Sequence, residues 1–158
     1  MEQHPQDSGF PERDQSGSTP AAGAALSNAE LLSLLQELLE GEIAGARVCL
    51  HIAHAATDSY RPLVTQLQHD EAHWCDVLAR QIKRLGGSPI TRAGAFYQKV
   101  MAIENLHERM SLLNRGQGWV VRKLHEALPR IEDENLKTEL TAMLHGHEVN
   151  MQKVAARV

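Results

Sequence analysis

Four polar residues interrupt otherwise apolar helical faces in this sequence, and their chemical types suit metal binding. Two are carboxylates, Glu42 and Glu71, one is an imidazole, His147, and one is an amide, Gln117. Carboxylate and imidazole groups are the usual protein ligands of iron, manganese and zinc. When side chains are placed at about 100° per residue, each of the four falls inside an apolar stripe, which predicts burial. Because an unpaired buried carboxylate is costly, something must neutralise the two acids.

The spacing of these residues predicts that they meet in one layer. Glu42 and Glu71 are 29 positions apart, and Gln117 and His147 are 30 apart. The midpoint of each interval falls in a predicted turn. The two members of each pair therefore lie at the same height on neighbouring helices, about 15 residues, or ~22 Å, from that turn. If the two hairpins pack with a pseudo-twofold relation, all four side chains meet halfway along a helical bundle.

The rest of the chain predicts an all-α protein with four long helices. Apolar residues make up 42% of the sequence and aromatic residues 4%, and the part after residue 26 has a helical composition. Capping residues, prolines and glycines predict helices at about 27–56, 62–85, 104–128 and 133–156. Residues 90–103 predict a long crossover with a short helical run. The sequence therefore predicts a four-helix bundle of two hairpins over 27–158, after a disordered Pro-, Gly- and Ser-rich tail over 1–26.

Charge and cysteine usage narrow the function classes. The formal net charge is -4, so no basic patch for nucleic acid or an anionic membrane surface is expected. Cys49 and Cys75 have no CxxC spacing, and the amino terminus has no signal-peptide pattern, so we expect a cytoplasmic protein. Leu32 and Leu39, which we place on the outer face of the first helix, suggest a homodimer.

The inward acids, their repetition in two hairpins and the long crossover resemble the ferritin-like superfamily, which includes rubrerythrin and bacterioferritin. In those families the first and third helices each supply a Glu, and the second and fourth each supply Glu-x-x-His, which together hold two iron or manganese ions. The runs WCDVLARQIKRLGGSP, GAFYQKVMAI and LNRGQGWVVRKLHEALPRI, followed by His147, Glu148 and Asn150, more closely resemble an uncharacterised bacterial family of ferritin-like domains. This resemblance implies the fold and no particular activity.

The first hairpin departs from the ferritin-like ligand pattern at one position. By the resemblance, Glu42 matches the carboxylate of the first helix and Glu71 the Glu of the second-helix motif. Trp74 stands where that motif has its His. A register that pairs Asp70 with His73 is the alternative, but the stripe directs His73 outward.

The second hairpin departs further from the same pattern. Gln117 stands at the height of the third-helix Glu, and His147 and Glu148 compete for the ligand place on the fourth helix. Asn150 and Met151 occupy the positions where the second motif has its His. The resemblance therefore implies a degenerate metal site.

Three interpretations of the layer follow. In the first, His147 is an imidazolium between Glu42 and Glu71, Gln117 donates its amide, and no metal is needed. In the second, Glu42, Glu71 and His147, with Glu148 or Gln117, hold a single Fe, Mn or Zn ion in a metal-binding oxidoreductase or iron-handling protein. The third is an intact two-metal oxidase.

The loss of both motif histidines favours the metal-free layer over the one-metal site, and the one-metal site over the two-metal oxidase. Arg115 is expected to reach Glu148 or Asp70 as a charge partner, which would support the metal-free layer. A non-enzymatic dimerisation module is the further alternative. The sequence leaves open whether the protein is an enzyme and what small-molecule substrate it takes.

Overall fold

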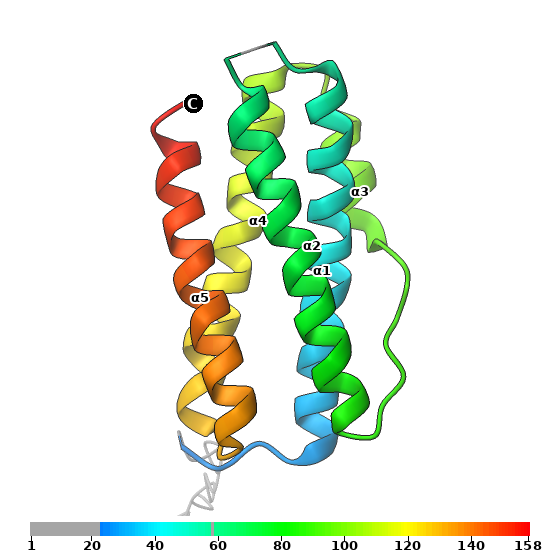
Figure 1. Cartoon of the computed structure of the whole chain (residues 1–158), viewed down its shortest axis with the longest axis vertical. Coiled ribbons are helices and arrows are strands. Elements are labelled where there is room, and N and C mark those ends of the chain that lie inside the picture. Colours follow the sequence, from blue (N-terminus) through cyan, green and yellow to red (C-terminus); the bar gives the residue numbers. More distant parts are fainter. Residues whose placement is uncertain (1–22, 58) are drawn as a thin grey trace, which may run out of the picture.

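The computed structural model describes residues 23–57 and 59–158, and the secondary structure of this part is helical throughout (Figure 1). The elements are α1 (Asn28–Ala55), α2 (Arg61–Arg84), α3 (Gly94–Met101), α4 (Leu106–Ala127), the 3-10 helix η1 (Leu128–Arg130) and α5 (Glu134–Ala155). The predicted fold class is confirmed: α1 and α2 form one hairpin, α4 and α5 form the other, and a long segment containing α3 joins them. None of the described helices is long and apolar enough to cross a membrane.

Most of the predicted disordered tail, residues 1–22, lies outside the described residues. Residues just before α1 contact the connection between α4 and α5. The Leu26 N–H donates to the Arg130 carbonyl at 2.9 Å, and Arg130 Nε donates to the Ala24 carbonyl at 2.7 Å. These bonds attach the start of α1 to η1, close to the turn between α4 and α5.

Side-chain caps explain where three of the long helices begin. Ser27 and Glu30 form a capping box at α1, in which the Glu30 N–H donates to Ser27 Oγ and the Ser27 N–H to Glu30 Oε2. Asn105 caps α4 and Asp133 caps α5, each accepting from a backbone N–H three residues later. Such caps satisfy N–H groups that have no partner within the helix.

The bundle core consists of two apolar clusters. One contains residues 31–39 of α1 with parts of α2, α4 and α5, and the other contains residues 48–56 with Val64, Leu67, Met110 and Val154 among others. On every long helix, the predicted inward polar residue lies between the stretches that enter the two clusters. The apolar clusters therefore hold the polar layer at mid-bundle.

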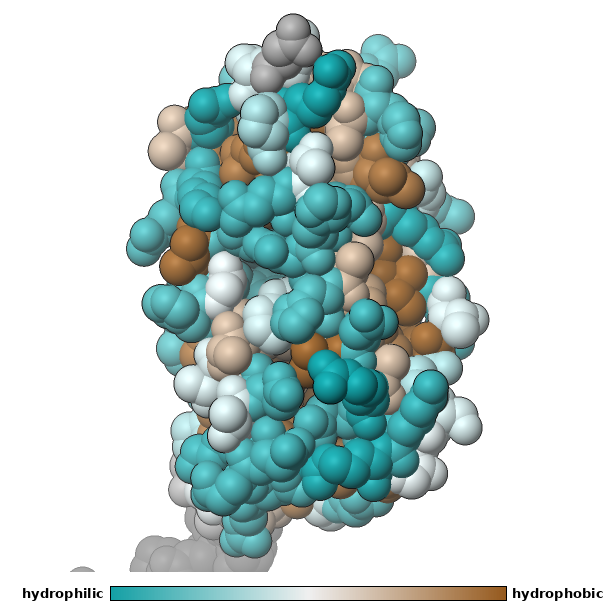
Figure 2. All heavy atoms as spheres, viewed as in Figure 1, coloured by the Kyte–Doolittle hydropathy of each residue, from teal (hydrophilic) through white to brown (hydrophobic). Residues whose placement is uncertain are grey.

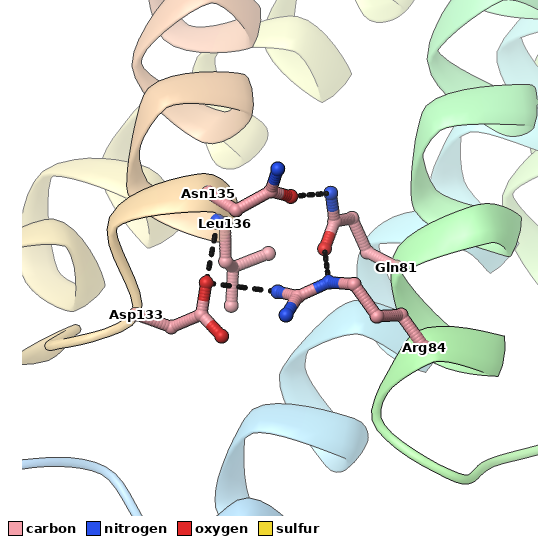
Figure 3. Close-up of polar contacts among 5 residues, drawn as sticks. All are labelled: Gln81, Arg84, Asp133, Asn135 and Leu136. Atoms are coloured by element: carbon pink, nitrogen blue, oxygen red, sulfur yellow. Dashed lines mark hydrogen bonds and ion pairs between the residues drawn. The ribbon is translucent and has the colours of Figure 1, made fainter.

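A polar network joins the two hairpins at the end of α2 and the start of α5 (Figure 3). Asp133 Oδ1 accepts from the Leu136 N–H at 2.9 Å and from Arg84 Nη2 at 2.8 Å, and these contacts lower the Asp133 pKa. Arg84 Nε donates to Gln81 Oε1 at 2.8 Å, and Gln81 Nε2 donates to Asn135 Oδ1 at 2.7 Å. The network sets the axial register of α2 against α5, the helices that carry Glu71 and His147.

The expectation that Leu32 and Leu39 lie on an outer face is wrong. Leu39 is 2% exposed, and Leu32 packs against the core cluster. The crossover covers this face of α1, because Gln36 exchanges hydrogen bonds with the backbone of Ser88 and Ile90. On the face seen in Figure 2, hydrophilic residues predominate and hydrophobic ones form separate small areas. The homodimer therefore loses the support of these two leucines, rests only on the resemblance to ferritin-like bundles, and stays a prediction.

Candidate metal centre

The four predicted residues lie buried in one layer, one from each long helix. Glu42 is 1% exposed, Glu71 4%, Gln117 3% and His147 1%. One donor atom from each of Glu42, Glu71 and His147 lies within 4.8 Å of the other two. Two carboxylates and an imidazole thus converge on one point, as the stripe and spacing arguments predict.

The hydrogen bonds of His147 fix which ring nitrogen faces the acids. Nδ1 lies 2.9 Å from the Met143 carbonyl oxygen, and Nε2 lies 2.9 Å from Glu42 Oε1. A carbonyl only accepts, so Nδ1 carries a hydrogen and donates it. Nε2 is thus the ring nitrogen that faces the carboxylates, and a histidine whose other nitrogen donates to a carbonyl is the arrangement found in metal-ligating histidines. Trp74, in the place of the missing motif His, lies beside this ring at 6.4 Å between centroids.

Burial raises the pKa of both acids in the layer. Burial raises the pKa of Glu42 to about 7, against a smaller lowering by its hydrogen bond with Glu71. Burial also raises the pKa of Glu71 well above its usual range, and the charge of Glu42 and the hydrogen bond between the acids raise it further. Both acids therefore keep their protons to a higher pH than exposed carboxyl groups do.

The layer is not fully satisfied by the protein. Among the described residues, Glu42 Oε2 and both amide atoms of Gln117 are buried without a hydrogen-bond partner. The expectation that Gln117 donates its amide within a metal-free network is therefore wrong. A buried amide without a partner costs about 1–3 kcal/mol, so these atoms indicate a place for a further ligand.

Glu71 approaches the α1 backbone closely because Gly45 has no side chain. A Cβ atom built on Gly45 would lie 2.7 Å from Glu71 Oε2 and 3.0 Å from its Cδ. These distances are shorter than van der Waals contact, so only glycine leaves room for the carboxylate in its observed position. Gly45 follows Glu42 by three residues on the same helix, and it therefore brings the second acid to the first.

A cavity of about 530 Å³ leads to the layer. Glu42, Glu71, Gln117 and His147 all line it, together with α1 and α4 residues and residues 93–96 at the start of α3. Phe96 packs closely against the α4 backbone because Gly116 has no side chain. A Cβ atom at Gly116 would lie 2.6 Å from the Phe96 ring. The acids and the imidazole are therefore within reach of a small molecule in the cavity.

Other residues that the sequence singled out lie away from the layer. Glu148 pairs with His125, with Glu148 Oε1 3.1 Å from Nε2, and 42% of its side chain is exposed. Asn150 is buried and its Nδ2 donates to Asp70 Oδ2 at 3.0 Å. His73 is exposed, so the stripe argument against its register is confirmed.

The expectation for Arg115 is wrong. Neither Glu148 nor Asp70 pairs with it, because these acids have the other partners described above. Within the described part of the chain, Arg115 has no ion-pair or hydrogen-bond partner. It is exposed and lines the cavity. The charge support that it was expected to give to a metal-free layer is absent.

Sequence reasoning overlooked the glycines that make the site. Gly41, Gly45 and Gly116 lie inside long helices and line the cavity. A glycine in a helix interior costs roughly 1 kcal/mol relative to alanine, so glycines at such positions indicate a packing or functional reason. The glycines within the helical stretches LEGEIAG and NRGQGW were therefore the sequence signal from which the cavity could have been predicted.

The fold and the layer define a ferritin-like four-helix bundle with a buried Glu-Glu-His group. The chain belongs to a family described as a domain of unknown function (DUF6306), whose model matches residues 29–156. No curated protein matches the chain.

Solved structures with the same fold include two proteins of known source. A structure described as ferritin-like, diiron-carboxylate proteins from Bacillus anthracis strain Ames is 23% identical with a TM-score of 0.72, and the match covers 83% of this chain and 98% of that one. A conserved hypothetical protein, rv2844, from Mycobacterium tuberculosis is 17% identical with a TM-score of 0.67, covering 83% and 96%. At these identities the matches establish the fold, and the resemblance to ferritin-like proteins is confirmed.

Proposed function

We propose that this protein binds one divalent Fe, Mn or Zn ion through Glu42, Glu71 and His147. The convergence of three buried donors within 4.8 Å carries the proposal. The unpartnered Glu42 Oε2 and Gln117 amide support it, because an ion and its bound water would satisfy them. The donors fit one ion and not two, since Trp74 stands where the second-helix motif requires an imidazole.

Each residue of the site has a distinct task in this proposal. His147 presents Nε2, held in place by the bond from Nδ1–H to the Met143 carbonyl. Glu71 gives up its proton when the ion binds, so affinity should rise with pH. The ion would supply Lewis-acid chemistry, and redox chemistry if it is iron or manganese, to a small molecule in the cavity. Oxygen or peroxide turnover is the reaction class to assay next.

Elemental analysis of untagged protein, expressed with iron, manganese and zinc supplied in turn, tests the proposal. We expect about one ion per chain for at least one metal, as three ligands suit a single ion. Two ions per chain would mean that a dinuclear centre forms despite the missing histidines. Folded protein that takes up none of the three metals would reject the proposal.

A metal-free layer is the second candidate, and the contact of 2.9 Å between His147 Nε2 and Glu42 Oε1 favours it. In that case the layer only fixes the helix register. Replacing a buried ionic layer with apolar residues is often neutral or stabilising by 1–4 kcal/mol. Glu42→Leu would then raise the melting temperature of the protein as isolated, whereas a bound metal predicts loss of the ion and a lower melting temperature.

Gly45→Ala is expected to weaken metal binding by about tenfold or more, because the added methyl pushes the Glu71 carboxylate away from its position. Helix propensity would by itself make this substitution stabilising by roughly 1 kcal/mol. Calorimetric titration with the preferred metal measures the affinity. Gly41→Ala is the matched control, since its Cβ would lie 3.4 Å from the Trp119 ring, an ordinary contact. Equal affinities of the two variants would contradict this account of Gly45.

A further inference from the structure

The cavity is lined mainly by apolar side chains and by backbone, so it suits an apolar molecule. Apart from the polar layer it is lined mainly by Leu112, Leu113, Trp119, Val120 and Phe96, together with small residues. Its volume of about 530 Å³ lies within the range of cavities that hold small organic ligands. The polar side chains of the lining are the four buried ones of the layer and the more exposed Glu37, Glu40 and Arg115, which we call the rim.

The charges at the rim are paired, with one exception. Glu37 Oε2 lies 3.2 Å from Lys123 Nζ, and Glu40 Oε2 lies 3.7 Å from Arg92 Nη2. Arg115 lines the same cavity without such a partner among the described residues. A guanidinium presents several donors in a planar fork that fits a carboxylate. The rim therefore offers one free site for an anion.

We propose that the cavity binds a monocarboxylic acid with an apolar body, whose carboxylate is held by Arg115. The acid enters with its apolar end first, because Arg115 is exposed at the rim whereas the lining inside it is mainly apolar. Its far end then lies toward the buried layer. Binding of the acid does not require a metal. Only a reaction of the bound acid would rest on the proposed function.

Calorimetric titration of metal-free protein with matched acids and alcohols tests this inference. The probes are octanoate against 1-octanol and 3-phenylpropanoate against 3-phenylpropanol. We expect at least one acid to bind about tenfold or more tightly than its alcohol, the value of one charge-assisted hydrogen bond. Octylammonium should bind more weakly than octanoate.

Two variants and one control separate the carboxylate contact from the cavity. Arg115→Gln should remove the preference for the acid and leave binding of the alcohol unchanged. Arg122→Gln is the control, because Arg122 is exposed on the same helix and does not line this cavity. Gly41→Leu should weaken acid and alcohol alike by filling space beside Trp119.

Several results would overturn the inference. They are no binding of either acid, equal binding of acid and alcohol, tighter binding of octylammonium, or an acid preference that survives Arg115→Gln. Because every titration is made without metal, failure of the metal proposal leaves these results readable, and loss of acid binding leaves the metal proposal untouched.

Discussion

The His147→Phe variant is expected to bind its divalent metal on the order of 100-fold or more weakly than the unaltered protein. Loss of an outer-shell partner alone costs 10–100-fold in metal affinity, and His147 is the only nitrogen donor of the proposed site. Phenylalanine keeps an aromatic ring beside Trp74, so the packing of α5 should largely be preserved. Titration with the preferred metal, followed by calorimetry and by the shift in melting temperature, measures the loss.

Two controls separate a ligand from a structural residue. His145→Phe changes an exposed histidine of the same helix and should leave the affinity unchanged. Glu148→Gln tests the competing ligand of the sequence analysis, and because Glu148 pairs with His125 at the surface, we expect no loss of metal. If His147→Phe keeps the affinity while Glu148→Gln lowers it, the assignment of ligands on α5 is incorrect.

The helices were predictable because local signals agreed with the apolar pattern. Ser27 with Glu30, Asn105 and Asp133 are caps that act within one turn of their own helix. The inward positions of Glu42 and His147 follow from helical periodicity alone. Equal distances from the turns then set their heights, so the layer could be placed without knowledge of the tertiary contacts.

Features that depend on another segment of the chain were not predictable in this way. Leu32 lies at the edge of the inward stripe of α1, where Gly87 of the crossover packs against it, and a helix pattern contains no information on which loop lies over a helix face. Gly45 can be noted as a costly residue, but its role depends on Glu71 of α2. Arg115 has a charge in the sequence and, among the residues that the structure describes, no partner in space. The cavity depends on missing side chains and missing partners of this kind, and helical periodicity predicts neither.

The stability of the metal-free protein is expected to fall as the pH rises from about 4.5 to about 7. Burial raises the pKa of Glu42 from 4.5 to about 7 in the folded state. Between these values the unfolded chain releases the Glu42 proton and the folded protein keeps it, so raising the pH favours unfolding. At roughly 1.4 kcal/mol per pH unit, the Glu42 contribution to the free energy of unfolding is about 3 kcal/mol, present below pH 4.5 and lost above pH 7. The raised pKa of Glu71 extends the decline beyond pH 7.

Urea unfolding of chelator-treated protein at several pH values measures this slope, and Glu42→Gln isolates the part that Glu42 contributes. Glu37→Gln, exposed on the same helix, is the control and should keep the slope of the unaltered protein. An identical slope in the unaltered protein and Glu42→Gln would rule out a raised pKa at Glu42. Saturating metal should reverse the sign, because an ion stabilises the ionised carboxylates and binds more tightly as protons leave. The reversal requires both the buried acids and the ion, so it tests the origin of the pKa shifts and the proposed function together.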